Sequence, residues 1–170
     1  MNADPLHPPP FSFREFVERA FLVLEAELPE MFTRLTETLD SARVALEIEG
    51  EKMVVDFRHE GQPGSSRIDV EKGWSRPLDA RIETEARTIL EVIDGAATLQ
   101  EAVNRGGVRA TAELDVLQVL LEGLEIFVHG GVRCPTFPAL LASFRSFVEW
   151  HAANETRQVL LSPRHNEPSP

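Results

Sequence analysis

The chain has 170 residues, 42% of them hydrophobic, and its 17 lysines and arginines against 28 acidic residues leave a net charge of −11. This length predicts one domain with a substantial core, and the acidic balance disfavours nucleic-acid binding and docking on anionic lipid. No apolar run reaches the roughly 18 residues of a membrane span, so we expect no integral membrane association.

The two ends of the sequence differ in composition from its middle. Residues 1–10 hold four of the twelve prolines, and residues 153–170 are mostly polar. We therefore expect a disordered N-terminal tail at 1–10, a domain at 11–152 and a flexible C-terminal tail at 153–170. The first residues show no secretory signal, and the single cysteine, Cys134, excludes an intrachain disulfide, so we expect a cytoplasmic protein.

The first part of the domain predicts two helices and a β-hairpin. Ser12 and Glu15 have the spacing of a capping box, and a helical apolar period follows over residues 13–24. A proline opens a second helix over residues 29–39. Residues 43–57 then alternate with a period of two, which predicts two strands joined by a tight turn at Gly50 and Glu51.

The remaining sequence continues with strands and helices. Alternating apolar residues predict three further strands, at residues 68–70, 79–84 and 108–114. Helical spacing predicts four further helices, at residues 86–93, 98–106, 115–129 and 138–148. We expect the helix over 115–129 to end at Gly130 and Gly131. This order predicts an α+β fold with five strands in a largely antiparallel sheet and helices packed on one face.

The segment over residues 116–128 is the most informative for function. Its only strongly polar residues are Gln118, Glu122 and Glu125, so the helix has to contact apolar groups on two sides. The last helix is also rich in leucine and phenylalanine. Either the two helices pack against each other over the sheet, or they wall a hydrophobic cavity. The pattern alone does not separate these interpretations.

A run of elements supports the second interpretation through a resemblance. Residues 79–84, 89–95, 99–107 and 108–115 read DARIET, ILEVIDG, LQEAVNRGG and VRATAELD. This succession of strand, helix, glycine, short helix, glycine, strand and long apolar helix resembles the sterol carrier protein 2 family, from about Ala42 to Gly131. The resemblance implies a five-stranded sheet with helices on one face, enclosing an apolar tunnel for sterols, fatty acyl chains or other lipids.

We therefore predict that residues 11–152 form a sterol carrier protein 2-like lipid-binding domain. It would bind an apolar lipid of fatty acyl, sterol or isoprenoid type without a cofactor, and transfer or present it. The predicted ligand-binding residues lie on the two apolar helices and are Leu117, Leu120, Leu121, Leu124, Phe127, Val128, Phe137, Leu140, Leu141 and Phe144. The alternative is an accessory protein whose apolar helices dock a biosynthetic enzyme or form a homodimer.

The sequence gives little sign of catalysis. The five histidines lack metal-ligand spacing and no nucleotide-binding loop is present, so we predict no metal site and no catalytic residue. A less favoured enzyme hypothesis uses Cys134, which follows Arg133 and lies five residues after His129. A positive neighbour can lower a thiol pKa, but a lone cysteine is more often a small buried hydrophobe.

Overall fold

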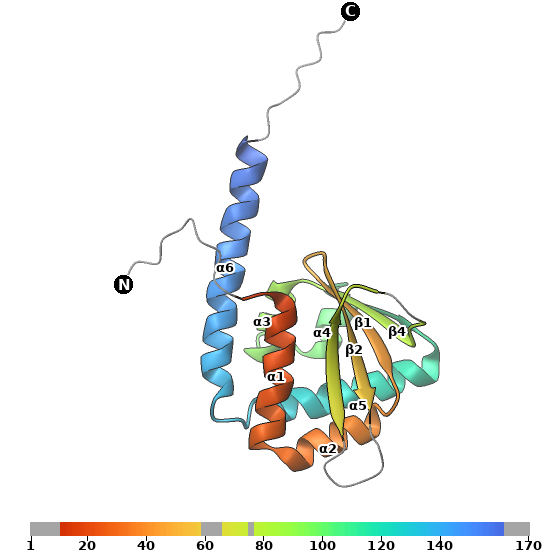
Figure 1. Cartoon of the computed structure of the whole chain (residues 1–170). Coiled ribbons are helices and arrows are strands. Elements are labelled where there is room, and N and C mark those ends of the chain that lie inside the picture. Colours follow the sequence, from red (N-terminus) through yellow and green to blue (C-terminus); the bar gives the residue numbers. More distant parts are fainter. Residues whose placement is uncertain (1–10, 59–65, 75–76, 162–170) are drawn as a thin grey trace, which may run out of the picture.

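The computed structural model describes residues 11–58, 66–74 and 77–161, with side chains described as far as residue 153 (Figure 1). The tail predicted at residues 1–10 and the end of the tail predicted at 153–170 lie outside these ranges. The elements in chain order are α1 (Phe13–Glu27), α2 (Pro29–Thr38), β1 (Arg43–Ile48), β2 (Glu51–Arg58), β3 (Arg67–Lys72), β4 (Ala80–Thr84), α3 (Ala86–Ile93), α4 (Leu99–Asn104), β5 (Val108–Ala112), α5 (Leu114–Gly131) and α6 (Phe137–Leu161).

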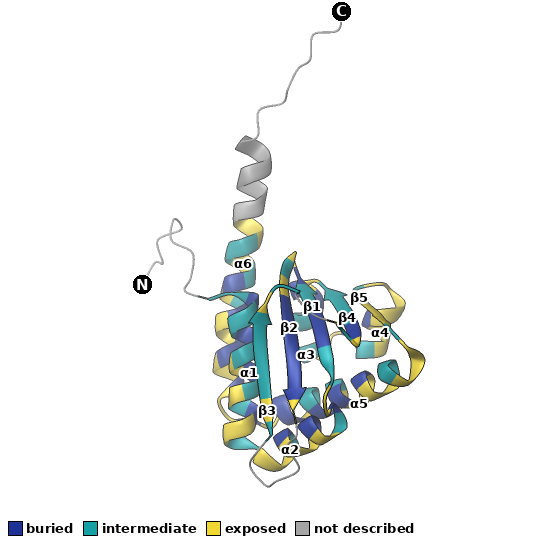
Figure 2. Ribbon diagram, turned by 45° about the vertical axis from the view of Figure 1, so that its right-hand side comes forward, coloured by how far each residue is buried: buried dark blue, intermediate teal, exposed yellow. Residues whose placement is uncertain are grey.

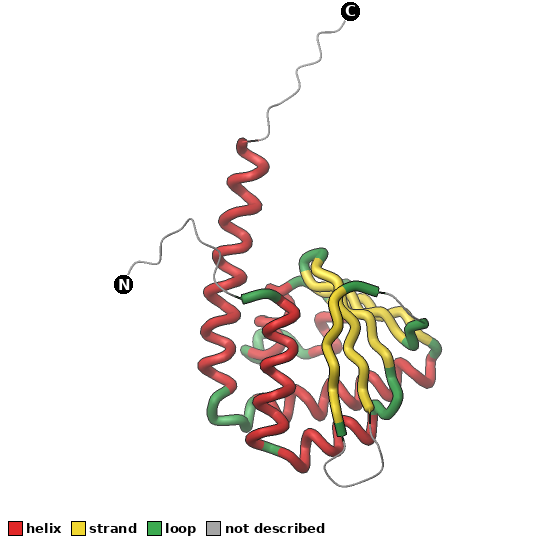
Figure 3. The backbone as a smooth tube through the Cα atoms, viewed as in Figure 1, coloured by secondary structure: helices red, strands yellow, loops and turns green. Residues whose placement is uncertain are grey.

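The five strands form one sheet in the order β3-β2-β1-β4-β5 (Figure 3). All neighbours pair antiparallel except β1 and β4, which pair in parallel. The helices lie on one face of this sheet, as Figure 2 shows. The predicted α+β class, with a largely antiparallel five-stranded sheet, is confirmed.

The β1–β2 turn contributes carboxylates to two helix N-termini. Glu49 and Gly50 form the turn with φ angles of 49° and 80°, one residue earlier than the sequence predicted. The Glu51 carboxylate accepts hydrogen bonds from the Phe13 amide and the following amide of α1, both at 3.1 Å. The Glu49 carboxylate accepts one from the Ala86 amide of α3 at 2.9 Å. Negative charge at a helix N-terminus is stabilising, so the hairpin stabilises the first turns of both helices.

The two capping boxes predicted from the sequence are present. The Ser12 hydroxyl accepts a hydrogen bond from the Glu15 amide, and the Glu15 carboxylate accepts one from the Ser12 amide. Thr98 and Glu101 make the same reciprocal pair at the start of α4. These short-range bonds need no tertiary contact, which is why the sequence pattern identifies both helix starts.

Helix α5 extends further than predicted, because Gly130 and Gly131 lie inside it rather than after it. Both glycines are buried. A Cβ atom on Gly130 would lie 2.5 Å from Cδ1 of Leu24 in α1, and one on Gly123 would lie within 2.8 Å of three atoms of Leu39. These glycines therefore serve close packing of α5 on its neighbours, and the helix ends at Gly131, two residues later than predicted.

Helix α6 packs on α1 through a cluster of aromatic rings. The rings of Phe16 and Phe144 stack with centroids 3.9 Å apart, and those of Phe13 and Phe147 meet edge-on at 4.9 Å. The apolar face of α6 is thus covered by α1, on the side of α1 away from the sheet (Figure 1). The helix continues to Leu161, past residue 152 where we placed the end of the domain.

The sheet face without helices carries ion pairs. Arg58 donates a hydrogen bond to the Asp56 carboxylate at 2.8 Å, and Arg43 lies 3.4 Å from the same oxygen. The indole of Trp74 lies between Lys52 of β2 and the Arg81 guanidinium of β4, and so spans β1 on this face. These long side chains cover a face on which none of the described helices lies.

The glycine in α5 gives a first prediction. We expect Gly130→Ala to lower the free energy of unfolding by about 1–2 kcal/mol, since overpacking costs ~1–3 kcal/mol and better helix propensity returns at most ~1 kcal/mol. Urea unfolding measures this, with His129→Ala, at the preceding position, as the control that should change little. Unchanged or increased stability of Gly130→Ala would contradict the close contact with Leu24.

The ion pairs give a pH-dependent prediction. The Arg58 hydrogen bond, with a smaller effect of Arg43, holds the pKa of Asp56 below its usual value. A carboxyl whose pKa is lowered by folding stabilises the fold at pH values above its unfolded-state pKa, which is near 4. This contribution is lost as the pH falls through the pKa of the carboxyl in the folded protein. Asp56→Asn should therefore cost about 1.5–3 kcal/mol at pH 7, and less as pH drops below about 4.

The control for Asp56→Asn is Asp69→Asn, at the position directly opposite on β3. Its partner, Arg67, is largely exposed, so the pair should contribute little. Thermal unfolding between pH 3 and pH 7 measures both variants. A cost of Asp56→Asn that stays constant over this range would contradict the assignment.

Candidate functional site

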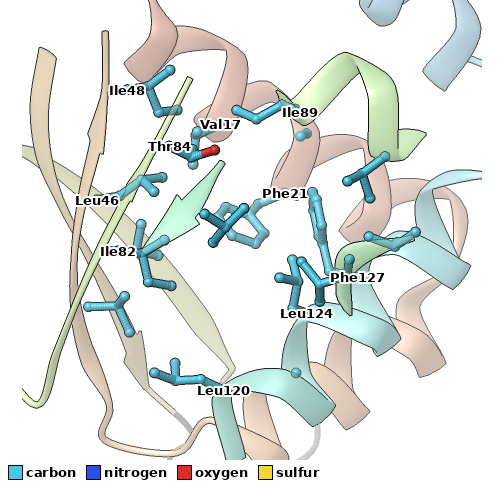
Figure 4. Close-up of a pocket in the computed structure, with 18 of the residues that line it drawn as sticks. Val17, Phe21, Leu46, Ile48, Ile82, Thr84, Ile89, Leu120, Leu124 and Phe127 are labelled. Atoms are coloured by element: carbon cyan, nitrogen blue, oxygen red, sulfur yellow. The ribbon is translucent and has the colours of Figure 1, made fainter. Parts of the chain in front are cut away.

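A cavity of about 210 Å³ lies between the sheet and the helices (Figure 4). Its walls come from β1, β2, β4 and Val108 of β5 on one side, and from α1, α2, α3, α5 and Leu99 of α4 on the other. Nearly all of its lining side chains are hydrocarbons, and among the described residues none of them is charged. The site is therefore an apolar chamber inside the domain.

Strand alternation forms the sheet wall of this cavity. Leu46 in the middle of β1 faces inward, with Ile82 of β4 beside it in the parallel register. Leu46 belongs to the central strand on the helix-covered face, yet it is only half-buried. A central-strand residue facing a filled core is normally fully buried, so this exposure reflects the open space in front of it.

Helices α1 and α5 form the opposite wall. Val17 and Phe21 of α1 point into the cavity, as do Leu124 and Phe127 of α5 (Figure 4). The rings of Phe21 and Phe127 meet with centroids 5.1 Å apart, which joins the two helices along the wall. Ile89 of α3 also borders the cavity.

The structure distributes the ten sequence-predicted residues over different surroundings. Four of them line the cavity: Leu120, Leu124, Phe127 and Val128. The other six do not: Leu117, Leu121, Phe137, Leu140, Leu141 and Phe144. Leu121 is 48% exposed on the outer side of α5, and the four residues of α6 are buried in the core. The reason is that α6 packs against α1, so its apolar face is not available to the cavity.

The cavity also contains residues that the sequence prediction missed. Val17, Phe21 and Ile89 belong to helices whose apolar stripes look like ordinary core faces. The inward strand positions Leu46 and Ile82 were identified by alternation, but as core rather than as cavity wall. The period of apolar residues in a sequence identifies which face of a helix or strand is buried. It does not indicate whether the side chains on that face fill the space between the elements.

The residues of the enzyme hypothesis do not form a reactive site. Cys134 is buried, with 2% exposure, whereas Arg133 and His129 are both exposed. Burial raises the pKa of the Cys134 thiol, and the Glu27 carboxylate raises it further. A raised pKa means less thiolate at neutral pH, so Cys134 is a weak nucleophile here.

Two further properties concern metals and membranes. In the parts of the chain that the structure describes, no three histidine, cysteine or acidic side chains are grouped so that they could hold a metal ion. Within the same residues, no helix combines the length and the apolarity needed to cross a membrane.

Comparisons with known proteins return similarity only at the level of structure. The sequence matches no protein-family model, and no curated protein matches it. A solved structure titled UbiJ-SCP2 ubiquinone synthesis protein has a TM-score of 0.48 and 13% identity, and the match covers 66% of this chain and 94% of that one.

Two other similar structures are a conserved hypothetical protein of Thermus thermophilus, possibly a sterol carrier protein, and sterol carrier protein 2. The first has a TM-score of 0.47 and 17% identity, over 73% of this chain and 88% of that one. The second has a TM-score of 0.46 and 18% identity, over 68% of this chain and 95% of that one. At these values the function has to be argued from the cavity of this chain itself.

The state of Cys134 gives a prediction about chemistry. We expect its thiol to react with Ellman's reagent at pH 8 at least about tenfold more slowly than free cysteine, because it is buried and its pKa is raised. The same protein unfolded in urea is the control and should react at the ordinary rate. A fast reaction of the folded protein would restore the enzyme hypothesis.

Proposed function

We propose that this protein binds an apolar molecule of lipid type in the cavity between its sheet and helices, and carries or presents that molecule without chemically changing it. The observation that supports this most directly is the chamber of about 210 Å³ whose described lining has no charged group. Acid–base catalysis needs a titratable side chain at the reacting atoms, and this lining supplies none. What the cavity offers is apolar surface.

Burial of apolar surface supplies the affinity. Each Å² of ligand surface removed from water contributes about 25 cal/mol before ordering costs are subtracted. An apolar cavity of about 150 Å³ in another protein stays dry and takes up benzene. A cavity of about 210 Å³ therefore encloses a ring or a short length of chain. A longer lipid would have to extend outside the enclosed volume.

The sequence resemblance to the sterol carrier protein 2 family supports the same class of ligand. It implies sterols, fatty acyl chains or other lipids, and we extend this to isoprenoid chains because their bodies are equally apolar. The hydrocarbon side chains of the cavity do not favour any one of these three ligand types over the other two.

The function is tested by direct binding. We expect the fluorescent hydrocarbon diphenylhexatriene to bind saturably with a stoichiometry of about one per chain, because one partly open apolar cavity offers one apolar site. Fluorescence titration measures the binding, and native mass spectrometry of the loaded protein checks the ratio. Fluorescence that rises without saturation would contradict the proposal.

A pair of variants on one helix tests whether the cavity is the binding site. Leu124→Trp places a bulky ring in the cavity and should weaken binding of the probe at least about tenfold, a loss of ~1.4 kcal/mol. Leu121→Trp, on the exposed outer side of the same helix, is the matched control and should bind normally. Equal effects of the two substitutions would show that the probe binds elsewhere.

A further inference from the structure

The cavity has one polar end. In the described lining, the side chains with a polar atom are those of Thr84, the last residue of β4, and Thr88, in the first turn of α3. Figure 4 shows the hydroxyl of Thr84 among hydrocarbon side chains. Both threonines adjoin Gly107, since Thr84 donates a hydrogen bond to its carbonyl oxygen and Thr88 occupies the space where a Cβ atom of residue 107 would lie. Two hydroxyls from different elements thus share one corner of an otherwise apolar site.

The Thr84 hydroxyl has already used its proton. It donates a hydrogen bond to the Gly107 carbonyl oxygen at 3.0 Å. A hydroxyl has one proton and two acceptor sites, so Thr84 can still accept a hydrogen bond from a ligand.

The Thr88 hydroxyl is different because it has no hydrogen-bond partner among the described residues, although the residue is only 5% exposed. Thr36 is the other buried threonine in a helix of the described chain. Its hydroxyl donates hydrogen bonds to the carbonyl oxygens of Phe32 at 3.2 Å and Thr33 at 2.9 Å. The Thr88 hydroxyl oxygen is not among the fully buried polar atoms that lack a partner, so a molecule the size of water can reach it. Thr88 therefore has a donor and an acceptor to offer in the cavity.

Gly107 leaves room beside this hydroxyl. A Cβ atom at position 107 would lie 2.9 Å from Oγ1 and 3.1 Å from Cγ2 of Thr88. The φ angle of Gly107 is not in the left-handed region, unlike that of Gly106, so the backbone conformation does not require glycine at position 107. The missing side chain instead allows the close approach of Thr88.

We propose that Thr84 and Thr88 form the polar end of the ligand site, and that the ligand carries a neutral hydroxyl or carbonyl group at one end of an apolar body. This rests on the proposed function and specifies its ligand. Thr88 donates to the oxygen of the ligand's end group, and a ligand hydroxyl donates in turn to Thr84 or Thr88.

The same corner disfavours a carboxylate. Burial of an ionised group is costly unless a positive partner accompanies it, and no charged side chain lines the described cavity. The charged group bonded to the N-terminus of α3 is the carboxylate of Glu49, which has the same sign as a fatty acid. A neutral end group therefore matches this site better than an anion of the same length.

Competition against diphenylhexatriene tests the preference. Decanol and decanoate have apolar chains of equal length and differ at the end group. At pH 8, where decanoate is ionised, we expect decanol to displace the hydrocarbon from the wild-type protein at a concentration at least about tenfold lower. Displacement by decanoate at the same or a lower concentration would overturn the proposal.

A variant locates the preference at Thr88. Thr88→Val keeps the shape and removes the hydroxyl, so it should weaken decanol about three- to tenfold and leave diphenylhexatriene binding unchanged. Thr36→Val, which removes a buried hydroxyl away from the cavity, is the matched control and should change neither affinity. An unchanged decanol affinity in Thr88→Val, or an equal loss for both compounds, would overturn the proposal.

The outcomes separate this inference from the function beneath it. If the wild-type protein fails to bind diphenylhexatriene saturably, the proposed function fails. If the hydrocarbon binds but decanol has no advantage over decanoate, only the polar end is wrong. If Thr88→Val does not fold, the comparison of decanol with decanoate on the wild-type protein still tests the polar end. Thr88→Ser then serves as a second variant, since it retains the hydroxyl and should retain the preference for decanol.

Discussion

The close contact of α5 with α1 and α2 is the constraint on which the cavity depends. Gly123 and Gly130 let α5 approach Leu39 and Leu24 more closely than a side chain would allow. With one side of α5 held there, its leucines at 120 and 124 face the sheet across a gap that they do not fill. A larger residue at either glycine would move the helix or its neighbours and change the width of the chamber.

Two further sets of contacts position the helices that border the cavity. The β1–β2 turn places Glu51 at the start of α1 and Glu49 at the start of α3, so one hairpin sets two helices that border the site. The stacked rings of Phe16 and Phe144 fasten α6 to the far side of α1. These contacts hold the helices around the cavity, together with contacts between lining residues such as the rings of Phe21 and Phe127.

The proposed function depends on which side chains line the cavity and which kinds do not. Hydrocarbon side chains provide affinity that depends on area and not on direction, so they accept many apolar bodies. The hydroxyls of Thr84 and Thr88 add direction at one end, and a site built around a hydroxyl can reject a ligand without a matching group. The buried thiol of Cys134, with its raised pKa, lies outside this arrangement.

The sequence by itself determined the elements, because strand alternation, helical period and capping boxes such as Ser12 with Glu15 depend on neighbours a few residues apart. It also indicated that α5 is apolar on two sides. Only the tertiary structure decided that α6 covers α1 instead of the cavity, that Gly130 packs closely against Leu24, and that Thr88 meets Gly107. These outcomes depend on which surfaces meet across long stretches of chain, and a local period carries no information about the distant partner.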